Sequence, residues 1–599
     1  MPACLRSTCL ALLLLATAAS GEPWHQERAV YQQALTAIQQ GNAAFYPQAR
    51  RLLADYPLLP YLEYAWLEQH LEQYPERQVR LFLQRHDGTF IARRLYLRWL
   101  NLLGHNRQWP VFERFYDADL ANDSLQCYHF EARLAAGDKP QAVYSRVSLF
   151  WLKPYSLPKA CDRVLAQWQA QGYLNADLAW QRFLASYGDN NRQLASYLLR
   201  YLSAEDKIVA DNLLNAHNKA GQWLADLAAG ETGKLDSSAI RRLLRSLAGQ
   251  HHQQIASLLK QQPQLLDNDH LLEIQQVTAW HLANTASGGQ ANQWLDDIDA
   301  DQQPGLTEYR LRYAMQDRNW LLYQRLFNQL NDQVNNNDEW LYWYAIAQQQ
   351  TGLQDDNSHF RPDAIFKLLA QRRSFYGFLA AERQHSDIAL PALPAPGINI
   401  SPQLAGRLAL ALELFHTGEL ADANREWYYA TRHFDSTQWH QAGLLAHQAQ
   451  WHDRSIQALA KAGQWQAIDE RFPLAYQSLF YRHSRNNDLH QGWLLAMARQ
   501  ESGFAARAES PVGAIGVLQL MPGTARQLAR DMRTEFSAGK LYEPDYNIAL
   551  GSRYLKNMLE RFGNNYILAT AAYNAGPARV SEWLAKRPLT DDWVHWVAT

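Results

Sequence analysis

Apolar residues recur at helical spacing along most of the chain, from Glu22 to about Arg383. Runs of alternating β-branched residues, which would predict strands, are few. The recurring unit is an apolar segment, a Gly or Asn turn that often carries a Trp, and a second segment, as around Gly104 and Gly221. The spacing is too irregular for a named repeat. The pattern predicts stacked helical hairpins, each burying its apolar face on its neighbours, as in an α-superhelix.

The many tryptophans of this region allow two interpretations. Trp99, Trp151 and Trp340 are examples that could stack on sugar rings or pack between hairpins. Large aromatic side chains serve more often as buried packing elements. We therefore expect these tryptophans to be wedges between helices.

A proline-rich run at residues 390–397 interrupts the helical pattern, since it cannot form a helix. Residues 398 to about 471 return to helical hairpins, and Phe472 and Pro473 open a last segment. At 599 residues the chain is too long for one core. We expect an all-α protein with a signal peptide at residues 1–21, a superhelical domain at 22–383, a small linker domain at 384–471 and a C-terminal domain at 472–599.

The first residues have the pattern of an export signal. Arg6 precedes the apolar run 10–16, and small residues follow at 17–21, which predicts cleavage near Gly21 or Glu22. This run is too short to span a membrane, and no later run approaches about 18 apolar residues. We expect an exported, soluble protein.

Beyond the signal the chain has two cysteines, Cys127 and Cys161. An exported protein with one pair favours a disulfide, and two buried thiols are the alternative. The formal net charge of −2 argues against a nucleic-acid-binding surface. The histidines show no spacing that favours a metal site, and no motif implies a cofactor.

Glu501 interrupts an apolar helical stripe. Read as a helix, its segment places Leu494, Met497 and Ala498 on the face that also carries Glu501. Gly503 predicts the helix end, so the carboxylate lies in the last turn, where unpaired carbonyls oppose negative charge. Desolvation and the helix dipole both raise the pKa of such a carboxyl group. A carboxylic acid that keeps its proton near neutral pH can protonate a glycosidic oxygen, so Glu501 is a candidate general acid.

The structural alternative is that Glu501 forms an ion pair with a neighbouring arginine, Arg499 or Arg507. The residues that follow Glu501 favour a catalytic role for it. A turn with one proline and two glycines allows the backbone to approach a ligand closely, and Gln519 then offers a polar amide among apolar side chains that end at Met521. This composition is typical of a binding cleft.

Three segments, RQES, GAIGVLQLMPGTA and AAYNAGP, occur in this order and resemble the catalytic domain of the lytic transglycosylases. The chain is most similar to the large soluble periplasmic type, in which a goose-lysozyme-like domain of glycoside hydrolase family 23 sits on a helical superhelix that closes into a U or ring. The resemblance covers the chain from the signal sequence to the last residue. The departures are small: Val517 and Leu518 stand where the family usually has Leu and Met, and Gly503 follows Ser502.

The resemblance implies that Glu501 is the single acid and base of a peptidoglycan lytic exotransglycosylase. This enzyme class, a lyase, cleaves the β-1,4 bond between N-acetylmuramic acid and N-acetylglucosamine and forms 1,6-anhydro-N-acetylmuramic acid. The resemblance also implies a periplasmic location in a Gram-negative bacterium, glycan strands as substrate and cell-wall synthases as partners. The residues expected to hold the N-acetylated sugars and line the cleft are Ser502, Gln519, Met521, Tyr573 and Asn574.

Two alternatives stay open. A goose-type lysozyme would hydrolyse the same bond with a second carboxylate to position water, yet Glu509, Glu535, Glu543 and Asp545 all lie in predicted loops or solvated turns. A truncated relative that binds peptidoglycan without cutting it is the other. In the family a segment similar to Ile-Pro-Phe-x-Glu-Thr-Arg-x-Tyr-Val follows a stretch like residues 596–599, so we expect the natural chain to continue beyond Thr599.

Overall fold

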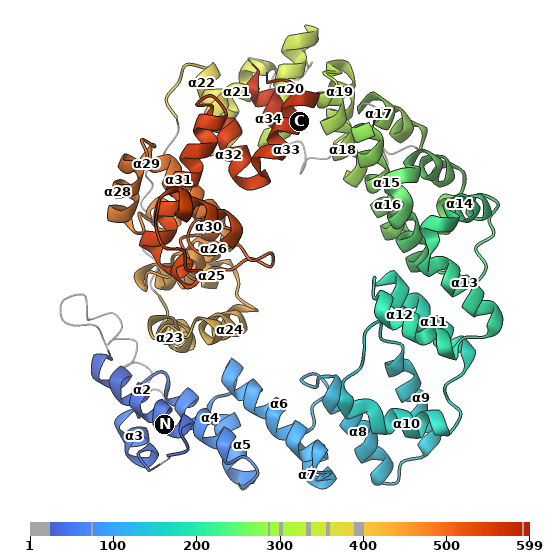
Figure 1. Ribbon diagram of the computed structural model, residues 1–599, viewed down its shortest axis with the longest axis vertical. Coiled ribbons are helices and arrows are strands. Elements are labelled where there is room, and N and C mark those ends of the chain that lie inside the picture. Colours follow the sequence, from blue (N-terminus) through green and yellow to red (C-terminus); the bar gives the residue numbers. More distant parts are fainter. Residues whose placement is uncertain are drawn as a thin grey trace. The chain divides into compact units, whose positions relative to one another are not determined.

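The computed structural model in Figure 1 describes residues 24–42, 44–73, 76–285, 288–298, 304–330, 337–354, 360–388, 400–589 and 592–599. The predicted signal peptide and the proline-rich run 390–397 lie outside these ranges. The all-α prediction is confirmed, because the described residues form helices and turns, and their only extended pairings are isolated bridges of Ile515 with Glu509 and Leu520. No described helix is long and apolar enough to cross a membrane.

The chain divides into two compact units. Unit 1 comprises residues 1–99 and 391–589, and unit 2 comprises residues 100–390 and 590–599. The predicted closure into a U or ring concerns both units together and stays a prediction.

Unit 2 consists of successive helices that pack pairwise, so that each buries its apolar stripe on the next; α15 and α16 are one such pair (Figure 1). The stacked hairpins predicted from the sequence are confirmed. The helices are α7 (Trp109–Phe115), α8 (Asp123–Ala135), α9 (Pro140–Trp151), α10 (Asp162–Ala170), α11 (Ala176–Gly188), α12 (Arg192–Leu198), α13 (Ala204–Leu214), α14 (Ala220–Ala228), α15 (Ser237–Gln261), α16 (Asn268–Thr285), α17 (Gly288–Asp297), α18 (Pro304–Gln316), α19 (Trp320–Phe327), α20 (Asp338–Thr351), α21 (Pro362–Ala370), α22 (Phe375–Arg383) and α34 (Trp593–Ala598).

The structure buries the three tryptophans that could either stack on sugars or pack between helices, Trp99, Trp151 and Trp340. Their burial confirms the prediction. Their exposed fractions are 4%, 5% and 2%. Trp151 packs on Trp168 with a ring-centroid distance of 5.4 Å and carries the Arg182 guanidinium over its ring at 4.4 Å. These rings are covered by protein, so they are packing wedges and not platforms for sugars.

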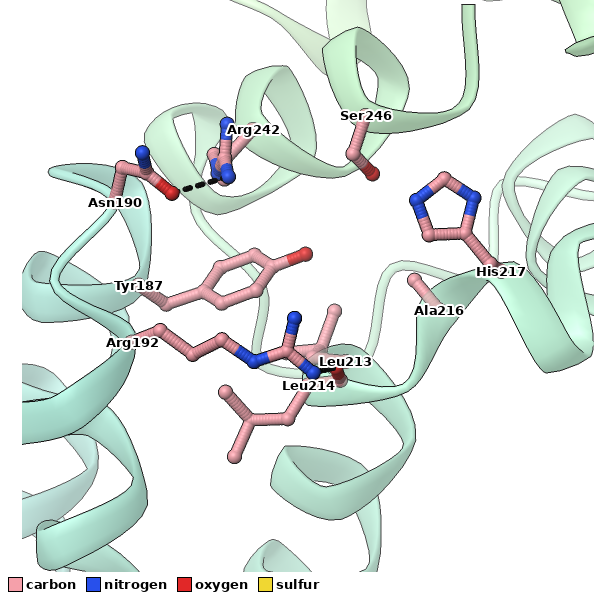
Figure 2. Close-up of a pocket in the computed structure, with 9 residues that line it drawn as sticks. All are labelled: Tyr187, Asn190, Arg192, Leu213, Leu214, Ala216, His217, Arg242 and Ser246. Carbon is pink, nitrogen blue, oxygen red and sulfur yellow. Dashed lines mark hydrogen bonds between the residues drawn. The ribbon is translucent and has the colours of Figure 1, made fainter.

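A cavity opens between α11, α12, α13 and α15 of unit 2 (Figure 2). It is separate in sequence from every residue that the motifs single out. The residues that line it are Tyr187, Asn190, Arg192, Leu213, Leu214, Ala216, His217, Arg242 and Ser246.

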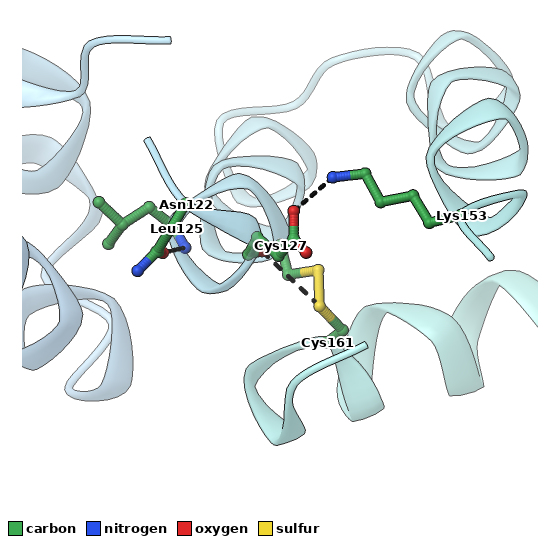
Figure 3. The surroundings of a disulfide bond; sticks show 6 residues. Asn122, Leu125, Cys127, Lys153 and Cys161 are labelled. Atoms are coloured by element: carbon green, nitrogen blue, oxygen red, sulfur yellow. Dashed lines mark hydrogen bonds and ion pairs between the residues drawn. A yellow bond between two sulfur atoms is a disulfide. The ribbon is translucent and has the colours of Figure 1, made fainter. Parts of the chain in front are cut away.

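The two cysteines of the mature chain form a disulfide, which confirms the first interpretation and excludes two free thiols (Figure 3). Cys127 lies on α8 and Cys161 ends the short 3₁₀ helix η1 (Lys159–Cys161), with Cα atoms 5.0 Å apart and no exposed surface on either residue. Beside the bond, the Asn122 side chain caps α8 by accepting from the backbone N–H of Leu125 at 3.0 Å. The disulfide therefore joins α8 to the start of α10.

The last helix, α34, belongs to unit 2. A ring nitrogen of His595 lies 2.8 Å from the carbonyl oxygen of Met315, and the ring packs edge-on against Trp320 and Trp343. Trp593 contacts Phe375 in the same way. The end of the described chain is therefore anchored in the core of α18 to α22.

Unit 1 joins the first helices of the chain to later ones through buried carboxylates. Glu413 accepts from Nε of Arg28 at 2.6 Å and from the hydroxyl of Tyr56 at 2.8 Å. Glu426 accepts from the hydroxyl of Tyr61 at 3.0 Å and from two backbone N–H groups at the start of α6. Because both oxygens of each carboxylate accept hydrogen bonds, its burial is tolerated.

The first helices therefore pack on α23 and α24, although they precede them by more than 300 residues. The helices of unit 1 are α2 (His25–Gln39), α3 (Tyr46–Leu52), α4 (Leu59–Gln69), α5 (Glu76–Arg85), α6 (Phe90–His105, which continues into unit 2), α23 (Pro402–His416), α24 (Leu420–Thr431), α25 (Ser436–Gln448), α26 (His452–Lys461), α27 (Ile468–Arg471), α28 (Gln477–Asn486), α29 (Gln491–Ser502), α30 (Pro522–Asp531), α31 (Pro544–Arg561), α32 (Tyr566–Ala575) and α33 (Pro577–Lys586).

Replacing Cys127 and Cys161 together by Ser tests the contribution of the disulfide. The bond closes a loop with a sequence separation of 34. We expect the double variant to lose about 3 to 4 kcal/mol of unfolding free energy, because the unfolded chain regains the entropy of that loop. Guanidinium unfolding of both proteins, with and without reductant, measures the difference. Reductant should destabilise the wild type and leave the variant unchanged; a variant as stable as the oxidised wild type would contradict the prediction.

Candidate active site

Glu501 lies one residue before the end of α29, as predicted. Leu494, Met497 and Ala498 on the same stripe are buried, and α29 ends at Gly503 with φ 60°. Glu501 itself is half-buried. The carboxylate thus continues an apolar face and lies in the last helical turn, where the helix dipole disfavours negative charge.

Gly503 is required for two reasons. Its positive φ favours glycine, and a Cβ atom there would lie 3.1 Å from both Cα and Cβ of Asp453 on α26. The neighbouring ring of Phe504 is buried and packs edge-on against His452, also on α26. The end of the helix that carries Glu501 is therefore positioned by a helix some 50 residues earlier in the chain.

The alternative in which an arginine neutralises Glu501 is wrong. Arg499 donates through Nε to the carbonyl of Arg471 at 2.7 Å, and its guanidinium lies over the ring of Phe472 at 4.3 Å. Arg507 is exposed and forms no ion pair with Glu501. Within the described ranges Glu501 has neither a hydrogen bond nor an ion pair.

Burial raises the pKa of the Glu501 carboxyl group above its ordinary value, and no charged neighbour contributes to the shift. The predicted direction is therefore confirmed. A half-buried carboxyl group with a raised pKa and no protein partner can hold a proton for transfer to a ligand.

The glycine-rich segment after α29 forms a compact loop against α31. Gly516 has φ 83°, and a Cβ atom there would lie 2.3 Å from Nδ2 of Asn547 and 2.3 Å from the carbonyl oxygen of Leu541. Only glycine fits this contact. The close approach of the backbone predicted for this turn is thus made to the protein itself, on the side that faces α31.

Asn547, which lies outside the three sequence motifs, holds this loop. Its side chain is fully buried, accepts from the backbone N–H of Leu518 at 2.8 Å, and donates to the carbonyls of Ile515 and Leu541 at 2.9 Å each. The signal that could have revealed it is an asparagine at a position where the α31 stripe is otherwise apolar, three residues before Leu550.

Ser502 and Tyr573 hold the same loop from two other helices. The hydroxyl of Ser502 on α29 donates to the carbonyl of Val517 at 2.7 Å, and the hydroxyl of Tyr573 on α32 donates to the carbonyl of Leu518 at 2.8 Å. Burial raises the pKa of Tyr573 well above its ordinary value, and the nearby charge of Glu501 raises it further. The hydroxyl protons of both residues are therefore engaged by the loop.

Gln519 adopts φ 45°, which is unusual for a residue with a side chain. Its Nε2 donates to the carbonyls of Gly516 at 2.9 Å and Ala508 at 3.3 Å. Because both partners are carbonyl oxygens, the orientation of the amide is fixed. Oε1 of Gln519 has no described partner and is free to accept a hydrogen bond from a ligand.

The remaining predicted residues are accessible. Asn574 is exposed at the end of α32, and Met521 is 43% exposed just before α30. Gly576 with φ 86° ends α32 and Pro577 begins α33, as the sequence predicts. The structure thus joins Glu501, Ser502, Gln519 and Tyr573 around one loop and leaves Asn574 and Met521 at its exposed margins.

The other candidate carboxylates have different surroundings. Glu509 accepts from the hydroxyl of Tyr542 at 3.0 Å. Asp545 pairs with Arg482 and His483, and these partners lower its pKa. Glu535 is exposed beside Lys540, and Glu543 is exposed at the start of α31. None shares the partly buried, unpaired state of Glu501.

No group of three or more His, Cys, Asp or Glu side chains in the described part of the chain could hold a metal ion.

Replacing Asn547 by Leu tests whether this residue holds the loop. The change keeps the branched shape but removes three hydrogen bonds from backbone groups of the loop, so we expect a loss of about 3 kcal/mol or more of unfolding free energy. Thermal unfolding of the full chain measures it. The control, Gln527→Leu on the exposed face of α30, should leave the stability unchanged. An unfolding temperature of Asn547→Leu equal to that of the control would show that Asn547 does not hold the loop.

Replacing Glu501 by Gln tests the raised pKa of its carboxyl group. Since the pKa is higher in the folded than in the unfolded chain, the wild type loses stability as the pH rises through that interval, and the variant does not. We expect the variant to match the wild type at low pH and to be the more stable protein above the folded pKa. Thermal unfolding from about pH 4 to about pH 8 measures this. A pH-independent difference would contradict it.

Two family models match the chain where these elements lie. The model described as "Transglycosylase SLT domain" matches residues 478–595, and the "Soluble lytic murein transglycosylase L domain" matches residues 405–468. The first therefore covers α28 to α33 with the candidate site, and the second covers α26, which packs on Gly503.

Relatives extend the similarity over nearly the whole chain. The soluble lytic murein transglycosylase of Salmonella typhimurium is 32% identical over 89% of this chain and 82% of its own length. That of Escherichia coli is 30% identical over 96% of this chain and 89% of its own length.

Solved structures agree with the sequence relatives. The lytic transglycosylase Slt of Pseudomonas aeruginosa, an inactive mutant in which a glutamate is replaced by glutamine, matches with a TM-score of 0.75 and 32% identity over 95% of this chain and 93% of that one. The 70-kDa soluble lytic transglycosylase of Escherichia coli matches with a TM-score of 0.78 and 29% identity over 96% and 93%. The chain belongs to the family of the soluble lytic murein transglycosylases.

Proposed function

We propose that this protein is a peptidoglycan lytic exotransglycosylase in which Glu501 is the acid and then the base. It cleaves the β-1,4 bond between N-acetylmuramic acid and N-acetylglucosamine and leaves a 1,6-anhydro ring on the muramic acid. The observation that carries the proposal is the state of Glu501, which is half-buried, has no described partner and has a raised pKa. That state matches the requirement for a proton donor to a glycosidic oxygen.

The reaction needs one carboxyl group acting twice. The Glu501 carboxyl protonates the oxygen of the leaving N-acetylglucosamine as the C1–O bond of the muramic acid breaks. The N-acetyl group of that muramic acid stabilises the anomeric centre, a substrate-assisted route. The Glu501 carboxylate then takes the proton of the C6 hydroxyl, and O6 forms the bond to C1. No water is consumed, and Glu501 ends the cycle protonated.

The loop around Gln519 orients the sugars of the substrate. Oε1 of Gln519 is held in place by the two hydrogen bonds of its Nε2 and accepts from an acetamido N–H group. Ser502 and Tyr573 act mainly through the loop carbonyls that they bind, and any sugar contact uses their remaining oxygen lone pairs. Asn574 and Met521 contact the sugars from the exposed margin.

A lysozyme that uses water on the same bond is the second candidate. It needs another carboxylate beside Glu501, and the four other candidate carboxylates are exposed or engaged elsewhere. The structural relative from Pseudomonas aeruginosa is described as inactive with a glutamate changed to glutamine. We infer that Glu501 has the same importance in this chain.

We further propose three domains with the boundaries 22–383, 384–471 and 472–599. We also propose that a signal peptide at residues 1–21 directs export, and that the protein acts on glycan strands in the periplasm. Docking to cell-wall synthases is implied by the family resemblance alone and stays a prediction.

Replacing Glu501 by Gln tests the mechanism. Loss of the general acid should lower the release of fragments from purified peptidoglycan by about a thousandfold or more, because glutamine cannot donate a proton to the leaving oxygen. Mass spectrometry of the soluble fragments measures both the amount and the chemistry of the product. The wild type should release fragments that end in 1,6-anhydro-N-acetylmuramic acid and are lighter by one water than reducing-end fragments.

The matched control is Glu535→Gln, since Glu535 is 84% exposed and pairs only with Lys540. This variant should retain wild-type release. Reducing-end fragments from the wild type would identify a lysozyme, and anhydro products from Glu501→Gln at the wild-type rate would remove Glu501 from the mechanism.

A further inference from the structure

The cavity of unit 2 gathers positive charge without a carboxylate to neutralise it (Figure 2). Its wall comes from α11, α12, α13, α15 and the 3₁₀ helix η3 (Ala216–Lys219). None of the residues that line it is an Asp or a Glu. The polar lining residues are Tyr187, Asn190, Arg192, His217, Arg242 and Ser246.

The two arginines are only partly engaged. Arg192 donates through Nη2 to the carbonyl of Leu214 at 2.5 Å, and Arg242 donates through Nη2 to Oδ1 of Asn190. A guanidinium group has five N–H donors, so most donors of both residues have no described protein acceptor. Neither arginine forms an ion pair with a described residue.

The neighbours of Arg242 on α15 differ from it in how their charge is paired. Arg241 and Arg245 both pair with Glu273 on α16. Arg242, between them in sequence, instead donates to Asn190 in the cavity wall (Figure 2). The fold thus neutralises the adjacent cations and leaves the charge in the cavity uncompensated.

Tyr187 adds a neutral donor at the same place. Its ring is buried, and its hydroxyl group points into the space between Arg242, Ser246 and His217 (Figure 2) without a described hydrogen-bond partner. Burial raises the pKa of Tyr187 to about 12, while the nearby charges of Arg242 and Arg192 lower it. The phenol therefore keeps its proton and adds a neutral donor to the two arginines that line the cavity.

We infer that this cavity binds a peptide carboxylate, and, resting on the proposed function, that the peptide is the stem carried by the lactyl group of N-acetylmuramic acid. Two guanidinium groups and a phenol suit the two oxygens of a carboxylate, which arginine binds in bidentate geometry. The apolar wall of Leu213, Leu214 and Ala216 suits a small aliphatic side chain such as that of alanine beside the carboxylate.

Isothermal titration calorimetry on the full chain tests the site. The probes are a synthetic stem tripeptide with free carboxyl groups, the same tripeptide with every carboxyl group amidated, and inorganic phosphate. The wild type should bind the free acid and neither of the others. The double variant Arg192→Ala with Arg242→Ala should bind at least about tenfold more weakly, because two charge-assisted contacts are lost. Tyr187→Phe, which removes one hydroxyl group, should weaken binding less.

The matched control is Lys207→Ala on α13, which removes an exposed cation that does not line the cavity. It should bind the tripeptide like the wild type. Equal binding of the tripeptide by the double variant and the wild type would overturn the site. Binding of the amidated tripeptide as tight as that of the free acid would also overturn it. Binding of phosphate as tight as that of the free acid would show that the site takes free anions and not the peptide.

Measuring the rate of fragment release distinguishes a failure of this inference from a failure of the proposed function. On glycan strands stripped of peptides, the double variant should release anhydro fragments at the wild-type rate, and on peptide-bearing strands at a lower rate. A wild type that binds the tripeptide but forms no anhydro product would disprove the proposed function and leave the carboxylate site standing. A double variant with the wild-type rate on both substrates would overturn the stem-peptide assignment.

Discussion

The candidate active site depends on how the backbone of one loop is satisfied. The segment between α29 and α30 has almost no regular structure, yet its residues 515–518 and Leu520 are buried, where unpaired N–H and carbonyl groups are costly. Asn547, Ser502 and Tyr573 supply the missing partners from α31, α29 and α32. Because three helices fix the loop, the left-handed backbone of Gln519 and the orientation of its amide are fixed as well.

The same packing explains the state of Glu501. Its neighbour Arg499 is occupied by the Arg471 carbonyl and the Phe472 ring, so no cation compensates the carboxylate. Gly503 allows α26 to approach within contact distance of the helix end. The segment that matches the L domain therefore helps to position the end of the helix that carries Glu501, in addition to joining the first helices of unit 1.

Several structural charged groups of this chain are held by hydrogen bonds or ion pairs. Both oxygens of the buried carboxylates Glu413 and Glu426 accept hydrogen bonds, and Arg241 and Arg245 share one carboxylate. Glu501 in unit 1, and Arg192 with Arg242 in unit 2, lack such compensation. These groups are available to a ligand, since an uncompensated charge gains from a partner of opposite sign.

The sequence by itself determined the helical hairpins, the ends of α29 and α32, the cysteine pair and the place of the candidate acid Glu501. Each of these follows from local periodicity, from glycine and proline, or from a residue out of place in an apolar stripe. The tertiary structure alone decided that Arg499 turns away from Glu501, that the hydroxyl groups of Ser502 and Tyr573 are engaged by loop carbonyls, and that Asn547 holds the loop. It also brought together the cavity of unit 2 from side chains up to 59 residues apart, Tyr187 and Ser246. These features depend on which helices pack side by side, and that is set by the sum of many distant contacts and not by any local pattern.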